Sequence, residues 1–250
     1  ARGRIEFRNV SFKYPKAEEY ALKNISFIAE PGETTAFIGS TGSGKSTLVN
    51  LIPRFYDVTG GEILLDDLDI RKIKLHDLRE KIGYVPQKSI LFSGTIESNL
   101  KYGKNFDAES EDIQQAIDIA QAKDFINEKE KGILSEIAQG GTNVSGGQKQ
   151  RLSIARALVE KPEIFIFDDS FSALDFKTDA ALRRAMNDLI KGRTVLIVAQ
   201  RINTIMNAEK IIVMDEGKIA GVGTHKELMK HCEVYKQIAL SQLSEEELAI

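Results

Sequence analysis

The stretch Gly39-Ser40-Thr41-Gly42-Ser43-Gly44-Lys45-Ser46-Thr47 decides how the rest of this chain is interpreted. The apolar run at residues 34–38 predicts a buried strand before it, and residues 48–52 predict the start of a helix after it. In that context the pattern G-x-x-x-x-G-K-S/T is typical of a phosphate-binding loop. An ordinary glycine-rich connection is the alternative, but every position of the pattern is matched and both flanking segments are of the expected type.

Different residues of this loop are expected to hold different parts of a nucleotide. Glycines allow the backbone to approach phosphate, and converging N–H groups at a helix N-terminus favour an anion. Lys45 would contact the β- and γ-phosphates, and the hydroxyl group of Ser46 would ligate Mg²⁺. We therefore expect residues 39–47 to bind a nucleoside triphosphate.

Length and composition limit what the chain can be. Its 250 residues, 42% apolar and 28% charged, suffice for one large domain or two small ones. A net charge of −3 gives no reason to expect a nucleic-acid partner, which usually requires a basic surface. The single cysteine, Cys232, excludes an internal disulfide and is consistent with a reducing compartment. No apolar run approaches the length of about 18 residues typical of a membrane span, but the start at Ala1 indicates a fragment of a longer protein.

The first part of the chain predicts strands at residues 5–12 and 21–28, with Tyr14-Pro15 in the turn between them. A residue before proline tends to be extended, so we expect Tyr14 to be partly exposed. Its ring could stack on a nucleobase, or it could be an ordinary surface tyrosine. The residues alone leave both interpretations open.

The next segments predict a short helix at residues 75–82 and a buried strand at 82–85 that ends before Pro86. Gln87 follows at the carboxyl end of this strand, where ligands lie in open α/β sheets, so it is a candidate contact to a metal or water. Helical patterns at residues 113–122 and 123–130 then replace strands. We interpret the region from about 90 to 150 as a helical insertion.

A second glycine-rich helix start, Ser145-Gly146-Gly147-Gln148, precedes a helical pattern that runs to residue 158. Ser145 is a good N-cap, and the glycines leave N–H groups accessible to an anion. A well-capped helix without a ligand is the alternative, which the residues alone favour.

Two further strands end in polar residues that can do chemistry. Residues 164–167 are all apolar, as in a central parallel strand, and Asp168 and Asp169 follow where a Mg²⁺ ligand is expected. A helix-capping role for Asp169 or Ser170 is the alternative. The strand at 194–199 leads to Gln200. Beyond it we expect a hairpin at 211–220, a helical tail from His225, a solvated acidic run at 244–247, and no metal site at the three histidines.

Motifs in this order resemble the ATP-binding cassette (ABC) family. They are the loop at 39–47, Gln87, Val144-Ser145-Gly146-Gly147-Gln148, Phe167-Asp168-Asp169 and Ser172-Ala173-Leu174-Asp175, together with exporter-like phrases at 9–15, 54–57 and 86–96. The resemblance covers essentially the whole chain, as a single domain over 1–250. It implies an α/β P-loop NTPase (RecA-like) core at 1–86 and 153–250 with an antiparallel β subdomain, and a helical subdomain at 87–152 that carries the signature.

The resemblance also implies roles for particular residues. Tyr14 falls at the position that stacks on the adenine of ATP, Gln87 at the hinge glutamine near Mg²⁺ and the attacking water, and Asp168 at the aspartate that holds Mg²⁺ through water. Ser145, Gly147 and Gln148 would grip the γ-phosphate of a nucleotide held by the opposite subunit. Two domains would then pair head to tail around two ATP molecules, with Asp175 crossing the same interface.

Two positions depart from the family pattern. The family normally has a glutamate after the Mg²⁺ aspartate as general base, whereas this chain has Asp169, whose carboxylate falls about 1.5 Å short. A misplacement of about 1 Å can cost on the order of 100-fold in rate. The family also has a histidine before Arg201; Gln200 can form hydrogen bonds but cannot relay a proton. A smaller departure is Gln139, where exporters often have glutamate.

We therefore expect ATP to be held firmly and hydrolysed slowly at this chain's own catalytic residues, Lys45, Gln87, Asp169 and Gln200. The intact signature predicts a partner: a second nucleotide-binding domain on a different chain, carrying the glutamate and the histidine. A membrane-spanning domain of the same polypeptide, met by the helical segment around 90–140, would place the protein at the cytoplasmic face of a membrane. The alternatives are a regulatory ATP-binding module with negligible hydrolysis, and a soluble ABC ATPase of DNA repair or translation.

Overall fold

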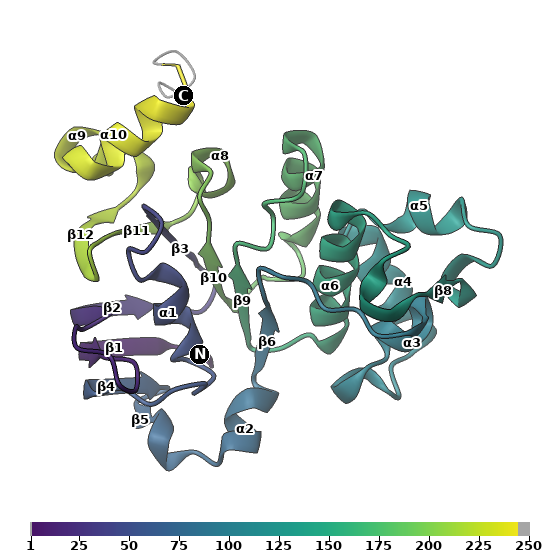
Figure 1. Cartoon of the computed structure of the whole chain (residues 1–250), viewed down its shortest axis with the longest axis horizontal. Helices are drawn as coiled ribbons and strands as arrows, with labels where there is room; N and C mark the ends of the chain where they lie inside the picture. The colour runs from purple at the N-terminus through teal and green to yellow at the C-terminus, as the bar shows by residue number, and fades with distance from the viewer. Residues whose placement is uncertain (1, 245–250) are drawn as a thin grey trace.

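A six-stranded sheet forms the centre of the computed structural model, which describes residues 2–244 (Figure 1). Its strand order is β12-β11-β3-β10-β9-β6, parallel except for the β11–β12 hairpin. The strands are β3 (Thr34–Gly39), β6 (Ile82–Val85), β9 (Ile164–Asp168), β10 (Thr194–Val198), β11 (Lys210–Asp215) and β12 (Lys218–Gly223). Because β3, β9 and β10 are adjacent and parallel, their carboxyl ends meet at one edge, where the phosphate loop and the carboxylates come together.

Side chains of the central strands alternate between two hydrophobic cores. In β9, Ile164 and Ile166 face a core shared with an antiparallel sheet and helix α1, whereas Phe165 and Phe167 face the other core. The antiparallel sheet has the order β2-β1-β4-β5. Its strands are β1 (Ile5–Phe12), β2 (Leu22–Ala29), β4 (Gly60–Leu65) and β5 (Leu68–Asp69), and the helices on this side are α1 (Lys45–Asn50) and α2 (Leu75–Glu80).

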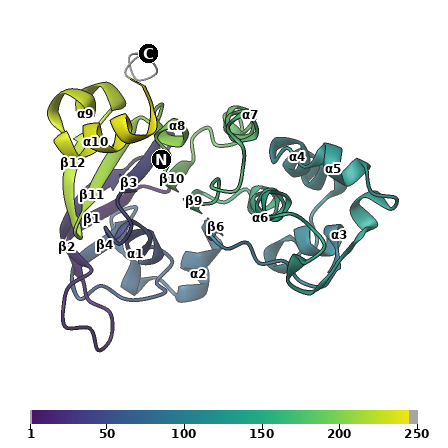
Figure 2. The ribbon, with the colours of Figure 1, turned by 45° about the horizontal axis from the view of Figure 1, so that its top comes forward.

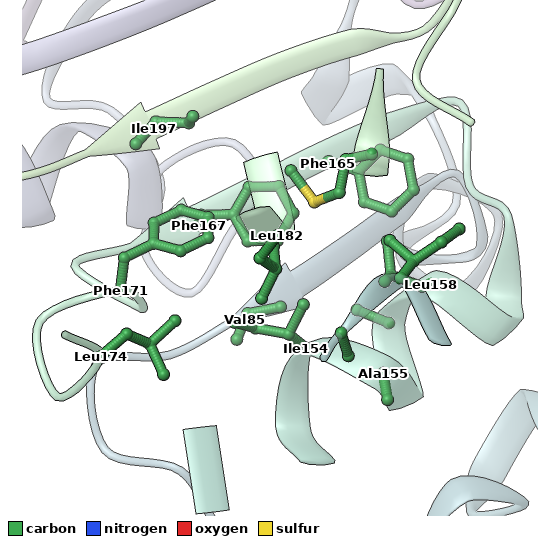
Figure 3. Close-up of a cluster of buried hydrophobic side chains, with 14 of the residues drawn as sticks. Val85, Ile154, Ala155, Leu158, Phe165, Phe167, Phe171, Leu174, Leu182 and Ile197 are labelled. Atoms are coloured by element: carbon green, nitrogen blue, oxygen red, sulfur yellow. The ribbon is translucent and has the colours of Figure 1, made fainter. Parts of the chain in front are cut away.

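Helix α6 (Gly146–Glu160) packs against the second core and joins the sheet to a helical region. Figure 3 shows Ile154, Ala155 and Leu158 of α6 in one cluster of buried side chains with Phe165 and Phe167 of β9. The helical region lies beside the sheet in Figures 1 and 2. It contains α3 (Ile96–Leu100), α4 (Ser110–Ile119), α5 (Lys123–Asn127), the ribbon β7 (Gly94–Thr95) and β8 (Glu136–Ile137), and 3-10 turns at Gly103–Asn105, Gly132–Leu134 and Gln139–Gly141.

The C-terminal part returns to the central sheet. Helices α7 (Phe176–Met186) and α8 (Ile202–Ile205) cover its second face, followed by α9 (His225–His231) and α10 (Glu233–Gln242), which Figure 2 shows beside β11 and β12. Among residues 2–244, no helix is both long and apolar enough to cross a lipid bilayer.

The predicted fold class is confirmed: an α/β P-loop core with an antiparallel β subdomain and a helical part. Several details differ from the sequence-based expectation. Helix α1 begins at Lys45 instead of Leu48, α5 ends at Asn127 instead of residue 130, and the β7–β8 ribbon was not predicted. The subdomain limits at 86/87 and 152/153 stay a prediction, and α6 passes through the second. Most of the acidic run at 244–247 lies outside the described residues.

Candidate nucleotide-binding site

The phosphate loop connects β3 directly to the first turn of α1. The N-cap of α1 is Gly44, with φ at 101°, so no side chain caps the helix. The first N–H groups of α1 are therefore left for another acceptor, as expected of an anion-binding terminus. Gly39 is required for a different reason, because a Cβ atom would lie 2.4 Å from the carbonyl oxygen of Met214.

Lys45 is buried inside this loop, with 7% of its surface exposed. Its ammonium group donates hydrogen bonds to the carbonyl oxygens of Gly39 (2.9 Å) and Ser40 (3.3 Å). Burial lowers the pKa of Lys45, an effect opposed by the negative charges of Asp169 and Asp168. Within residues 2–244 the buried hydroxyl oxygen of Ser43 has no hydrogen-bond partner. A buried cation, an unpaired hydroxyl and free helix N–H groups together suit a bound polyphosphate.

Ser46 and Asp168 are brought together from α1 and β9. The Ser46 hydroxyl donates to Asp168 Oδ1 at 2.8 Å, and the Tyr84 hydroxyl lies 3.2 Å from Asp168 Oδ2 and 2.8 Å from Asn50 Oδ1. Hydroxyl and carboxylate oxygens are ligands that Mg²⁺ accepts when phosphate oxygens and water complete its shell. No cluster of three or more His, Cys, Asp or Glu side chains suited to a metal occurs in the described part of the chain. The donor set therefore fits a metal that arrives with a nucleotide.

Asp169 begins the loop after β9 in an unusual backbone conformation. Its φ is 51°, in the left-handed region that aspartate tolerates better than most side chains. The Gln87 amide donates to Asp169 Oδ2 at 3.2 Å. Burial, and next the charge of Asp168, raise the pKa of the Asp169 carboxyl, whereas Lys45 and Arg201 oppose this shift. The carboxyl group of Asp169 is thus buried at the edge of the hydrophobic core.

Gln200, Tyr14 and the phosphate loop line one open cleft of about 760 Å³. Tyr14 is half-buried: its hydroxyl lies 2.6 Å from Thr47 Oγ1, and its ring packs edge-on against Tyr56 at 5.2 Å. Gln200 is exposed and belongs to the same lining. The lining comprises Tyr14, Glu19, Tyr20, Ala21, Lys23, Thr41, Gly42, Gly44, Lys45, Ser46, Thr47, Gln87, Gln200, Glu216 and Gly217.

The other predicted nucleotide-contacting segment lies outside this cleft. Ser145 caps α6 by accepting a bond from Gln148 N–H, while the Gln148 side chain accepts one from Ser145 N–H, both at 3.1 Å. Ser145 is exposed, and Gly147 lies close to the next loop, since a Cβ there would be 3.2 Å from Ala173 O. The structure therefore gathers Tyr14, residues 39–47, Gln87, Asp168, Asp169 and Gln200, but leaves Ser145, Gly147 and Gln148 apart.

Sequence reasoning missed two residues that organise the site. Tyr84 reaches Asp168, and a tyrosine inside a buried strand could have signalled this because its hydroxyl needs a partner. Gln150, buried in α6, donates to Gln87 O at 3.5 Å and accepts from Ala173 N–H at 3.0 Å. It links the Gln87 segment to the loop before α7.

The phosphate loop between β3 and α1, with carboxylates at the end of the parallel strand β9, places this chain in the P-loop nucleoside triphosphatase class. Residues 22–172 match the family described as ABC transporter. The chain belongs to the ABC transporter family, as a nucleotide-binding domain of the exporter type, and such domains are ATPases coupled to transport.

Relatives and a solved structure agree with this assignment. The chain is 46% identical over 242 residues to an uncharacterized ABC transporter ATP-binding protein of Mycobacterium tuberculosis, covering 96% of this chain and 41% of that protein. It is 45% identical over 243 residues to an ATP-dependent lipid A-core flippase of Hahella chejuensis, covering 97% and 42%. A solved bacterial Atm1-family ABC exporter with ATP bound superposes with a TM-score of 0.94 at 36% identity, covering 98% of this chain and 43% of that one. The chain thus spans about two fifths of the relatives' length.

Proposed function

We propose that this chain is the ATP-driven motor domain of a heterodimeric exporter, and that it supplies the half with the weakened catalytic side. One observation carries the proposal: Asp169 and Gln200 stand where a glutamate and a histidine are expected. The Asp169 carboxyl group is held back at the core edge by Gln87, and Gln200 brings no imidazole to the cleft. ATP then stays bound at this site for a long time, because its hydrolysis there is slow.

The residues around the cleft have separate roles in this proposal. Tyr14 stacks on adenine, and residues 39–47 bind the phosphates, with Lys45 leaving its carbonyl partners for phosphate oxygens. Ser46, Asp168 and Gln87 hold Mg²⁺, which neutralises phosphate charge when bound. Asp169 orients the attacking water, and Gln200 contacts the γ-phosphate.

The exposed start of α6 is the second half of the proposal. Ser145, Gly147 and Gln148 lie outside this chain's own cleft, but their exposed N-terminus can meet the γ-phosphate held by a partner domain. Two domains that pair head to tail bring each such terminus to the other's phosphate loop. ATP binding closes the pair, and hydrolysis at the partner's stronger site opens it.

The remaining partner, a membrane-spanning domain, is inferred from the relatives and from one surface of this chain. The named relatives are longer than this chain, and a further relative, from Bacillus subtilis, is described as a putative multidrug export ATP-binding/permease protein. A membrane-spanning domain on the same polypeptide therefore places this domain at the cytoplasmic face of the membrane. Exposed apolar side chains of the helical region, namely Ile90, Phe92, Tyr102 and Phe106, provide a surface for contact with that domain.

The test is to restore both missing groups with Asp169→Glu and Gln200→His. In the assembled pair we expect ATP turnover to rise by about tenfold or more, since a displaced catalytic group can cost up to about 100-fold. Asp188→Glu makes the same chemical change at an exposed position of this chain and should have no effect.

Two outcomes would contradict the proposal. No gain in turnover by the double variant, with an unchanged melting temperature, would count against a weakened site. Complete absence of hydrolysis by the isolated chain in a single-turnover measurement, before and after the substitutions, would favour a regulatory ATP-binding module.

A further inference from the structure

One side chain of the C-terminal helix holds the backbone on both sides of Arg201. The Gln242 amide nitrogen donates to the carbonyl oxygen of Gln200 at 2.6 Å, and its oxygen accepts from Ile202 N–H at 2.8 Å. These two bonds use the donor and acceptor of a single amide, as a neighbouring strand would. The segment that they hold carries Gln200 into the nucleotide cleft.

The position of Gln242 is itself fixed by the packing of α10. Tyr235 and Ala239 of this helix are fully buried in the second hydrophobic core. The Tyr235 hydroxyl lies 2.6 Å from Nδ1 of the buried His225, which ties α10 to α9. Gln242 is the last residue of α10, so an anchored helix presents its amide to the Gln200 segment.

The Arg201 side chain fastens the same segment to the loop before α7 and to α7 itself. Its guanidinium donates to the carbonyl oxygens of Phe171 (2.6 Å) and Leu174 (2.8 Å) and to Asp179 Oδ2 (2.8 Å). Asp179 is 1% exposed and also accepts from Arg183 and Thr204. The Arg201 side chain is thus firmly held, but none of its bonds reaches the carbonyl oxygen of Gln200, which accepts from Gln242.

We propose that Gln242 is a positioning residue of the nucleotide site, through which α10 sets the place of Gln200 at the γ-phosphate. The inference rests on the proposed function, because it requires Gln200 to contact that phosphate. The adenine and the α- and β-phosphates are held by Tyr14 and the phosphate loop, which Gln242 does not contact. Loss of Gln242 therefore weakens recognition of a triphosphate and leaves recognition of a diphosphate intact.

The experiment measures affinities of the full chain for ADP and for the imido analogue of ATP by calorimetry. We expect Gln242→Ala to weaken binding of the ATP analogue by roughly three- to tenfold, the effect of about one hydrogen bond. The affinity for ADP stays within about twofold of the original. Gln237→Ala is the matched control, because Gln237 is exposed on the same helix and bonds only weakly to Glu233 at 3.5 Å.

A second variant separates the two bonds that Gln242 makes. In Gln242→Glu the carboxylate still accepts from Ile202 N–H but cannot donate to Gln200 O. We expect hydrogen exchange at the Ile202 amide to stay slow in this variant and to speed up in Gln242→Ala. Binding of the ATP analogue is weakened in both.

The outcomes distinguish the inference from the proposed function. Unchanged affinities in Gln242→Ala, with weaker binding of the ATP analogue in Gln200→Ala, would overturn the inference alone. Unchanged affinity in Gln200→Ala would remove the role of Gln200 and the inference with it. Equal weakening for both nucleotides, with a melting temperature lowered by more than about 5 °C, would reduce Gln242 to a structural contact.

Discussion

The starts of α1 and α6 are both glycine-rich helix N-termini, yet they are built differently. The start of α1 has no side-chain cap, includes the buried Lys45, and lines the open cleft. The start of α6 is exposed and already closed by reciprocal bonds between Ser145 and Gln148.

The difference teaches what each terminus can do alone. Uncapped N–H groups beside a buried cation bind polyphosphate from within one chain. We expect an exposed terminus that is already capped by its own side chains to bind a free anion weakly, and to contact a phosphate group only when another molecule holds that group next to it. We expect the first terminus to govern affinity for ATP and the second to govern turnover in the assembled pair.

The largest expected effect comes from Lys45→Ala. Loss of charge-assisted hydrogen bonds worth about 3 kcal/mol should lower the affinity of the isolated chain for ATP by about 100-fold. Calorimetry with the isolated chain measures it, and Lys226→Ala, at an exposed position of α9, is the control. An affinity reduced by less than about threefold would contradict the claim that the start of α1 governs the affinity for ATP.

Ser145→Asp tests the other terminus with a smaller expected effect. Aspartate caps a helix as well as serine does, so the melting temperature should hold, but its carboxylate opposes a phosphate group. We expect turnover of the assembled pair to fall by about tenfold, roughly one lost hydrogen bond plus repulsion, while the isolated chain binds ATP unchanged. Thr224→Asp, at the cap of α9, is the matched control. Weaker binding of ATP by the isolated Ser145→Asp chain would show that the start of α6 also contributes to the affinity for ATP.

The smallest effect concerns stability. Because the pKa of Asp169 is raised in the folded chain, its stabilising contribution is present below the unfolded pKa of about 3.9 and is lost as pH rises through the folded value. Asp169→Asn removes the buried charge, tolerates the left-handed backbone, and can still accept from Gln87. We expect a melting temperature about 2–4 °C higher than the original at pH 7, about 1 kcal/mol, and a gap that narrows toward pH 4. A gap independent of pH, measured by thermal unfolding, would contradict this.

Much of the fold could be predicted because its central strands are short runs of apolar residues. The apolar runs at residues 34–38 and 164–167 predict strands, and the loop at 39–47 that follows the first run carries a complete phosphate-binding motif. The sequence pattern predicts the start of α1 three residues late because Lys45, Ser46 and Thr47 are polar and hide the helical periodicity. The two-residue strands β7 and β8 are too short to show any alternation.

The candidate site was predictable where its residues belong to motifs, and not where tertiary contacts place them. Tyr84 and Asp168 are 84 positions apart, and Gln242 and Gln200 are 42 apart. Neither pairing follows from local spacing. The burial that perturbs Asp169, and the left-handed conformation at that residue, likewise depend on the assembled core edge.

Helix α6 has a mechanical consequence. At about 1.5 Å per residue its 15 residues form a stiff rod of about 22 Å, with Ser145 at the free tip and Leu158 gripped by the sheet. Gln150, a little over one turn from that tip, holds the main chain of Gln87, which in turn holds Asp169. We therefore expect a molecule that binds at Ser145 and displaces this end of α6 to change the position of the Asp169 carboxylate through these two bonds.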